Sequence, residues 1–349
     1  MRKLLTMFLF GSMVFALALP TALAQAPANE HNCPASMAIP ATVGTGNPPF
    51  SPNQNLCLPL LAPVGGSMGP LAFIVQGVEP GDRVDSQGTI YVVSIRGVPG
   101  GIDLWRWYQT TDGAPNGDSS LPFKYEGQPD NCGILTNGCA NNVGSFINPG
   151  VAPGGGDADI AVNAPDPLNF NIPNLAASSL DLVPGVTATH STTRGDTFTA
   201  PNVAAALIPV DDRQWQDAID VSTAYLTYHD IATFNIEVQR SNDGGFTYVN
   251  GIGEAIDPQT FPATGGVPAS NSANVHGQLR IDHSPIANSC SSRGNLYQIF
   301  VAPDSVTENL TGGALRSVYV GVSTDAKLGL PAFTFTDTKV FTGLAGPKP

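Results

Sequence analysis

A repeated pattern of short strands and tight turns is the feature of this sequence that most constrains its fold. The octet SNDGGFTY at Ser241–Tyr248 joins two runs with the alternation of β-strands, and Asp-Gly is the strongest short-range signal for a β-hairpin. Degenerate relatives occur as STTRGDTF at Ser191, as STD and a later FTF from Ser323, and as TTDG at Thr110. A unit that recurs along a chain predicts a repeat architecture.

A second signature precedes each copy of the octet. It is a strand that ends in Val or Ile followed by Asp or Asn, then a turn and a second strand. It begins at Arg83 (RVDSQGTIYVV), Ala218 (AIDVSTAYLTY), Arg280 (RIDHSP) and, in a weaker form, Ala161 (AVN). Four units of roughly four strands each, at a period of about 55 to 80 residues, predict a β-propeller with four recognisable blades.

The composition supports an all-β fold. The 349 residues include 38 glycines and 31 prolines, yet 42% of the chain is hydrophobic, which excludes a disordered chain. No long stretch places apolar residues at the spacing of an amphipathic helix, whereas short alternating runs bounded by Gly, Pro, Asn and Asp are frequent.

The first 24 residues have the layout of a signal peptide. Arg2 and Lys3 form the basic start, Leu4–Leu19 the apolar core, and Ala22–Ala24 the small-residue cleavage site. The apolar run is too short to span a membrane comfortably, and no later segment is a candidate span. We therefore expect an exported protein, secreted or periplasmic, with a Pro- and Asn-rich segment over residues 25–77 and the propeller over 78–349.

The net charge excludes two classes of partner. The formal charge is −13, and removal of Arg2 and Lys3 with the signal peptide takes it to −15. An acidic, Lys-poor surface is unsuited to nucleic acid and to anionic membranes. It says little about small ligands, because a local group of arginines overrides the overall charge.

Five cysteines are present, and an exported protein meets an oxidising compartment. The short spacing predicts a disulfide between Cys132 and Cys139, and a second between Cys33 and Cys57. Cys290 then has no partner. Metal binding by these cysteines is the weaker interpretation, because the sequence contains no C-x-x-C pair.

The complete octet resembles the Asp-box, Ser-x-Asp-x-Gly-x-Thr-aromatic, of sialidase-like (BNR repeat) β-propellers. The matching residues are Ser241, Asp243, Gly245, Thr247 and Tyr248. The segments DDRQW at Asp211 and YLTYHD at Tyr225 also look like bacterial members of that superfamily, and the resemblance covers roughly residues 79–342. It implies a structural role for the box: Asp243 accepts backbone N–H groups, Gly245 supplies an unusual φ, and Tyr248 packs inward.

The resemblance also implies a ring of six blades, of which this sequence shows four. The prolines before Glu79 make regular central strands in the N-terminal segment unlikely to form. We therefore expect an incomplete propeller, as in a truncated product, with four blades in an arc and a strand edge near the C-terminus.

A sialidase-like active site, as the resemblance implies, needs three arginines around a carboxylate, an Asp general acid/base, and a Tyr nucleophile assisted by Glu. The Arg-Ile-Pro motif of the first arginine is absent, since Arg83 precedes Val-Asp and Arg280 precedes Ile-Asp. Their equal register predicts a repeated structural position. Arg213, beside Asp212 at the expected mouth of the channel, is the best candidate ligand contact; the alternative is a salt bridge at the strand entrance.

The remaining candidates each have a structural alternative. Tyr228 and His229 end a strand and are candidates for acid/base chemistry, or are packed under a loop. Trp105 and Trp107 alternate along one strand, which suits sugar stacking, although core packing is the default for both.

Calcium is the one ion that the sequence suggests. Asp157 and Asp159 in GGGDADI have the ligand type that Ca²⁺ prefers, although a glycine-rich turn with incidental acids is the favoured interpretation. No cofactor is required by any motif, and His276 has no partner in sequence.

Two functions follow from these observations. The first is a binding module for a carbohydrate or a cell-surface protein, without a demonstrable catalytic set. The alternative is an exo-glycosidase of the sialidase type that acts on sialic acid or a related sugar. The missing Arg-Ile-Pro motif favours binding, since fold alone does not decide function.

Overall fold

The structure is a computed structural model. It describes residues 78–97, 101–107, 124–131, 139–140, 155–181, 185–203, 211–230, 235–256, 263–264, 267–268, 275–284, 292–303 and 317–343. The N-terminal segment 1–77 lies outside these residues, as do Cys33, Cys57, Cys132 and Cys290, and Cys139 is described in its backbone alone. The signal peptide and both disulfides therefore stay predictions.

Four antiparallel sheets of four strands each make up most of the described part of the chain. The first contains β1 (Val78–Val84), β2 (Ile90–Gly97), β3 (Gly101–Trp107) and β4 (Lys124–Gly127). The second contains β6 (Ala158–Asp166), β7 (Ile172–Leu180), β8 (Val186–Ser191) and β10 (Asn202–Val203). The third contains β11 (Asp211–Ile219), β12 (Thr223–Asp230), β13 (Asn235–Ser241) and β14 (Gly251–Glu254). The fourth contains β17 (Val275–Ile281), β18 (Leu296–Ala302), β19 (Ser317–Ser323) and β20 (Thr336–Thr342).

Small elements complete the described structure. Two-stranded sheets are formed by β5 (Cys139–Ala140) with β9 (Thr197–Phe198) and by β15 (Ala263–Thr264) with β16 (Val267–Pro268). Two short 3-10 helices are η1 (Pro129–Asn131) and η3 (Ala326–Leu328). Among the described residues no helix is long and apolar enough to cross a membrane.

Each four-stranded sheet contains one of the repeated signatures. Arg83 lies in β1, Ala161 in β6, Ala218 in β11 and Arg280 in β17, so each signature marks the first strand of a sheet. The all-β fold is confirmed, and the described residues contain the four blades that the repeat predicted.

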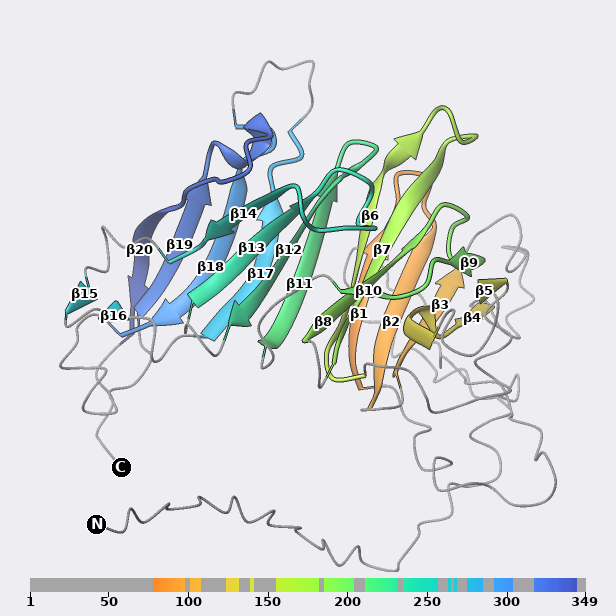
Figure 1. Ribbon diagram of the computed structural model, residues 1–349, viewed down its shortest axis with the longest axis horizontal. Helices are drawn as coiled ribbons and strands as arrows, with labels where there is room; N and C mark the ends of the chain where they lie inside the picture. The colour runs from red at the N-terminus through yellow and green to blue at the C-terminus, as the bar shows by residue number, and fades with distance from the viewer. Residues whose placement is uncertain are drawn as a thin grey trace, which may run out of the picture.

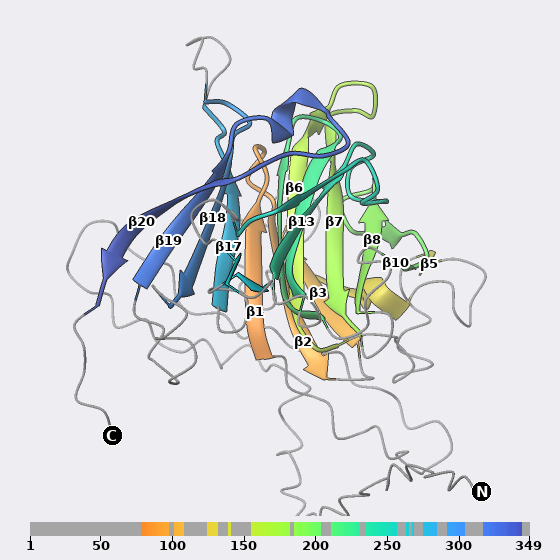
Figure 2. The ribbon, with the colours of Figure 1, turned by 60° about the vertical axis from the view of Figure 1, so that its left-hand side comes forward.

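The blades are arranged around their first strands. They follow one another in chain order, so that the colours in Figure 1 run from orange at the first blade to blue at the fourth. Strands β1, β6, β11 and β17 contact one another in turn, and Figure 2 shows the sheets fanning outward from them. Radially arranged, four-stranded antiparallel sheets are the architecture of a β-propeller. Strand β20 is the outer edge of the fourth blade, with Val340 and Phe341 exposed.

The hydrophobic core is divided into layers between neighbouring blades. Tyr91 and Ile160 lie in the layer between the first two blades, and Ala176 and Leu226 lie in the layer between the second and third. Phe300, in the layer between the third and fourth blades, stacks on Tyr319 with ring centroids 5.5 Å apart. Both faces of the third blade are thus buried, which explains why every residue of β13 is buried.

The octet forms the turn that the sequence predicted. Asp243 accepts a hydrogen bond from the Thr247 backbone N–H at 2.9 Å, and Ser241 Oγ accepts one from the Gly245 N–H at 2.9 Å. Gly245 has φ 89°, and a Cβ there would lie 2.1 Å from the Cβ of Ala176 in the second blade. Tyr248 is 3% exposed. The structural role expected for these residues is therefore confirmed.

Candidate functional site: an axial pocket

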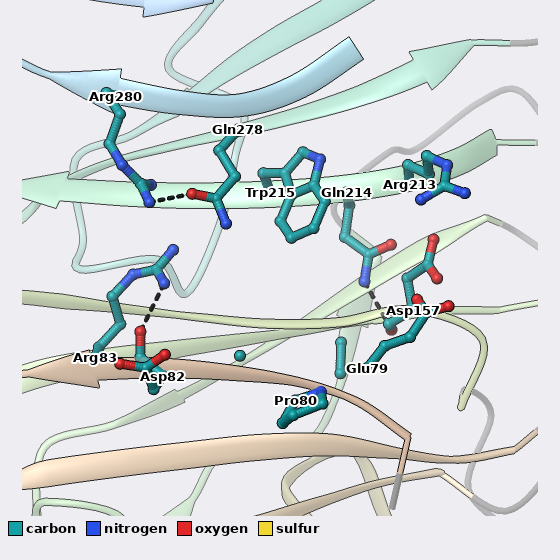
Figure 3. A pocket seen from close by; sticks show the side chains of 12 residues that line it. Glu79, Pro80, Asp82, Arg83, Asp157, Arg213, Gln214, Trp215, Gln278 and Arg280 are labelled. Carbon is teal, nitrogen blue, oxygen red and sulfur yellow. Dashed lines mark hydrogen bonds between the residues drawn. The ribbon is translucent and has the colours of Figure 1, made fainter. Parts of the chain in front are cut away.

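A pocket of about 470 Å³ lies where the first strands of the four blades converge. Its lining residues come from β1, β11 and β17 and from the entrance of β6, as Figure 3 shows. The volume is within the range of small-molecule sites. Because the pocket is built from one strand of each blade, residues that are far apart in sequence meet in it.

Arg83 is fixed in place at one end of the pocket. Its Nη2 donates to both carboxylate oxygens of Asp159, each at 3.2 Å, and to the Gln216 carbonyl at 3.0 Å. The Asp159 carboxylate also accepts the Gln216 backbone N–H at 2.6 Å. Burial raises the pKa of Asp159 to about 6, and the Arg83 charge opposes this shift. The carboxylate is therefore mostly ionised at pH 7, and the ion pair ties three blades together.

Arg280 lies at the same end of the pocket but has no carboxylate partner. Its guanidinium donates to the Leu279 carbonyl at 3.0 Å and to the side chain of Gln278. In Figure 3 the side chains of Arg280 and Arg83 extend toward one another from β17 and β1. Arg280 is exposed and joins no ion pair among the described residues. Its charge is therefore available to an anionic ligand.

Arg213 lies at the opposite end of the pocket, on a β-bulge. The pairing of β11 with β12 shifts register between Asp212 and Gln214, and Arg213 has φ 49°. Glu79, in the irregular start of β1, also has φ 49°. Positive φ at non-glycine residues is strained and is often found at functional sites.

Asp157 supplies a carboxylate at the Arg213 end. Burial raises the pKa of Asp157, and so do the charges of Asp212 and Glu79, whereas the charge of Arg213 lowers it. One Asp157 oxygen is buried without a hydrogen-bond partner. This end of the pocket therefore favours a proton or a hydrogen-bond donor.

Trp215 forms the middle of the pocket lining. Its half-buried indole lies between the two arginine ends in Figure 3. Next to it, Gln214 is held by a hydrogen bond from Nε2 to the Asp157 carbonyl at 2.7 Å. A planar aromatic ring flanked by amide, guanidinium and carboxylate groups has the chemistry to bind a sugar ring and its hydroxyls.

The structure brings three arginines to one pocket. Arg213 was predicted as a ligand contact and lines it, and Arg83 and Arg280, which were predicted to be repeated structural positions, line it as well. Equivalent positions on successive first strands meet at the axis, so equal register is the reason that these two side chains converge. Arg83 does have a structural role, through Asp159.

The predicted acid/base candidates do not line the pocket. Tyr228 is 6% exposed and accepts a hydrogen bond from Gln239 Nε2 at 3.0 Å. His229 faces His276, with ring centroids 6.2 Å apart, and burial lowers the pKa of both imidazoles. Asp212 is next to the lining residue Arg213 but is not part of the lining. Among the described residues of the lining there is no Tyr–Glu pair.

The tryptophan predictions need correction. Trp105 is 3% exposed in the third strand of the first blade, so it is core and does not stack on a ligand. Trp107, at the end of the same strand, is half-buried and does not line the pocket. The tryptophan that does line the pocket, and that sequence reasoning missed, is Trp215. Its position two residues after Arg213 on a first strand is the pattern that identifies it.

The calcium candidates Asp157 and Asp159 are not arranged around one ion. Asp159 is occupied by Arg83 and the Gln216 N–H, whereas Asp157 faces the pocket. In the part of the chain that the structure describes, no three His, Cys, Asp or Glu side chains form a ready metal-ligand set.

Comparisons with known proteins do not assign a family. No protein-family model matches the sequence, and no curated protein matches it. Solved structures with some similarity include a GH43 β-1,3-galactosidase (12% identity, TM-score 0.37, covering 75% of this chain and 45% of that one). A GH62 α-L-arabinofuranosidase of Coprinopsis cinerea has 13% identity and a TM-score of 0.33, covering 70% and 63%. An exo-β-1,3-galactanase of Phanerochaete chrysosporium has 12% identity and a TM-score of 0.35, covering 76% and 50%.

These similarities are weak, and this chain spans less than two thirds of each of those structures. With TM-scores below 0.5 they carry no argument about activity. What the topology and the pocket define directly is a class: an all-β protein of propeller type, with a ligand-sized pocket on its axis.

Proposed function

We propose that this is an exported, sialidase-like propeller that binds a glycan in the axial pocket through an acidic sugar, without hydrolysing it. The observation that carries the proposal is Arg280, an exposed guanidinium in the pocket with no carboxylate partner among the described residues. Arginine donors are suited to carboxylates because both are planar and pair in bidentate fashion.

The remaining lining suits the rest of a sugar. Trp215 offers an apolar face to the ring, and Gln278 offers an amide to its hydroxyls beside Arg280. Arg83 adds a second guanidinium whose position is fixed before binding by Asp159. A site whose donors are already ordered loses less entropy when the ligand binds. The described lining residues include Glu79 but no tyrosine, so they do not supply the Tyr–Glu pair of a sialidase-like site.

The proposal is tested by glycan-array binding followed by calorimetry with the best ligand. We expect sialic or uronic acid glycans to bind in preference to their neutral counterparts. Arg280→Ala should weaken binding by about 10- to 100-fold, because a charge-assisted hydrogen bond is lost. Trp215→Ala should weaken it by about tenfold. Phe170→Ala is the matched control, since this aromatic is 90% exposed in the β6–β7 turn.

Two results contradict the proposal in different ways. If neutral glycans bind as well as acidic ones and Arg280→Ala binds normally, the pocket does not select a carboxylate. If folded protein binds no glycan on a broad array, the glycan-binding function itself is wrong.

A second candidate function is an exo-glycosidase, and Asp157 is the observation that favours it. Burial and the nearby charges of Asp212 and Glu79 raise the pKa of this pocket carboxyl, and a general acid must hold its proton near neutral pH. The test is turnover of a panel of aryl glycosides, sialosides included. Asp157→Asn should lower kcat/KM about 100-fold, while Asp82→Asn, another carboxylate of the lining, should leave it within about twofold. No turnover on any substrate would exclude this candidate.

A further inference from the structure

The third blade carries a group of buried oxygen atoms, of which only one member, Gln214, also belongs to the lining of the axial pocket. We call it the Asp211 cluster: Asp211, Gln214, Asp230 and Glu237. Asp211 pairs with Asp230, Gln214 pairs with Tyr228, and Tyr228 pairs with Glu237 across three neighbouring strands. Directly paired residues share one face of a sheet, so these side chains lie on the same face of the blade.

The members of the Asp211 cluster are all buried. Asp211 is 7% exposed, Glu237 8%, Gln214 1% and Asp230 0%. An ionised carboxylate that loses its water needs a cation or several hydrogen-bond donors in return. The surroundings of the cluster therefore decide whether its carboxyl groups are ionised.

Four oxygen atoms of the cluster have no hydrogen-bond partner. They are both carboxylate oxygens of Asp211, one oxygen of Glu237, and the amide oxygen of Gln214. Each of these atoms is an acceptor in the ionised cluster, so they have no way to satisfy one another. Native structures leave few buried polar atoms unpaired, and an ion is one of the recognised explanations.

The described part of the neighbouring surface contributes no ion-pair partner to the cluster. The face of the second blade that packs against this side of the third contributes apolar residues, among them Ala176, Val186 and Ala188. Neither Asp211 nor Glu237 forms an ion pair among the described residues. The amide of Asn235, at the edge of the cluster, donates instead to Glu254 at 2.8 Å.

We infer that the Asp211 cluster binds one divalent cation between the second and third blades, and that the cation is Ca²⁺. Carboxylate and amide oxygens are hard ligands that suit Ca²⁺ and Mg²⁺, and Ca²⁺ tolerates irregular geometry better. The side chains do not already converge as a set of three, so Asp211 and Glu237 must rotate toward the ion. This site is distinct from the calcium candidates Asp157 and Asp159.

The inferred site has a direct connection to the axial pocket. Asp211 and Gln214 bracket the bulge that carries Arg213, and Gln214 also holds the Asp157 carbonyl. A cation bound to both residues fixes the two ends of the bulge. The effect of the cation on the stability of the folded chain does not depend on the proposed glycan binding. Either proposal therefore stands if the other fails.

The test is thermal unfolding of the full exported chain after treatment with EDTA. With CaCl₂ at about 100 times the dissociation constant we expect Tm to rise by roughly 5 °C, with a smaller rise in MgCl₂ and none in NaCl at equal ionic strength. Calorimetry should give one Ca²⁺ per chain, with a dissociation constant on the order of 10⁻⁴ M, as in extracellular modules.

Matched variants locate the site. Asp211→Asn and Glu237→Gln should each weaken Ca²⁺ binding at least about tenfold. In EDTA both variants should be no less stable than the native chain, because each removes an uncompensated charge. Asp181→Asn is the control: Asp181 is 6% exposed, its two oxygens are also unpartnered, and it lies outside the cluster.

Three results overturn the inference. One is a native chain whose Tm and calorimetry show no response to Ca²⁺. Another is a Ca²⁺ response that survives in both Asp211→Asn and Glu237→Gln. The third is a response that Asp181→Asn abolishes, which would place the ion elsewhere.

Discussion

Two buried carboxylates of the second blade, Asp159 and Asp181, have opposite surroundings. Asp159, on β6, is fully buried and accepts hydrogen bonds from Arg83 of the first blade and Gln216 of the third. Asp181, just after β7, is 6% exposed, and neither of its carboxylate oxygens has a partner. Its neighbour Asp130 is itself acidic, but Asp130 is satisfied by the Ile102 N–H at 3.0 Å and Ser179 Oγ at 2.9 Å.

The difference shows that the position of a buried acid in the blade decides whether it is ionised and whether it joins neighbouring blades. Burial raises the pKa of Asp159 to about 6, against the opposing charge of Arg83. Burial and the charge of Asp130 raise the pKa of Asp181 to about 7. At pH 7 Asp159 is therefore mostly an anion that joins three blades, whereas Asp181 is about half protonated and joins none.

The largest effect is expected from Asp159→Ala. It leaves the partly buried Arg83 without its counter-charge and removes the acceptor of the Gln216 N–H, so we expect a loss of about 3 kcal/mol in the free energy of unfolding. Chemical denaturation measures it. Asp82→Ala, an exposed carboxylate next to Arg83, is the control and should change stability by less than about 0.5 kcal/mol. Equal effects of the two variants would show that the Asp159 contact adds nothing to stability.

The second prediction concerns pH and Asp181. Its folded-state pKa lies above the unfolded value, so its contribution to stability is complete below about pH 4 and is lost as pH rises toward 7. Asp181→Asn cannot ionise, and we expect it to be more stable than the native chain by about 2 kcal/mol at pH 8. Thermal unfolding from pH 4 to pH 8 tests this, and parallel curves for the two proteins would contradict it.

The smallest effect is expected at two turns, one exposed and one partly buried, that repeat the contrast between a charged and a neutral acceptor. In the third blade Asp243 accepts the Thr247 N–H, and in the second blade the Thr193 hydroxyl accepts the Thr197 N–H, each at 2.9 Å. We expect Asp243→Ala to cost about 1–1.5 kcal/mol and Thr193→Ala about 0.5 kcal/mol. The same denaturation assay measures both. An equal loss would show that the carboxylate has no advantage over the hydroxyl.

The blades could be predicted from the sequence because their defining interactions are local. The Ser241 hydroxyl and the Gly245 N–H are four residues apart, as are Asp243 and the Thr247 N–H. A turn of this kind depends on a few neighbouring residues, and strand alternation depends on two-residue spacing. The sequence pattern of a single blade can therefore be recognised without reference to the contacts between blades.

One residue of the pocket, Arg213, could be predicted from the sequence, but the pocket as a whole could not. Arg213 follows from its place at the entrance of a first strand, but the ion pair of Arg83 and Asp159 joins residues 76 positions apart. Arg280 and Trp215 meet Arg83 only because successive first strands converge. Sequence periodicity predicts which residues share a face of one strand. It does not predict which residues of different blades meet in the pocket.

The hydrogen bonds between first strands have a consequence for the order of folding. Asp159 reaches the Gln216 N–H 57 residues ahead, and Asp217 reaches the Ile281 N–H 64 residues ahead at 2.9 Å. Because loop-closure entropy grows only with the logarithm of loop length, these two closures cost nearly the same. Each blade becomes fully bonded only when the next one has formed, so the chain is suited to assemble blade by blade from its amino-terminal side.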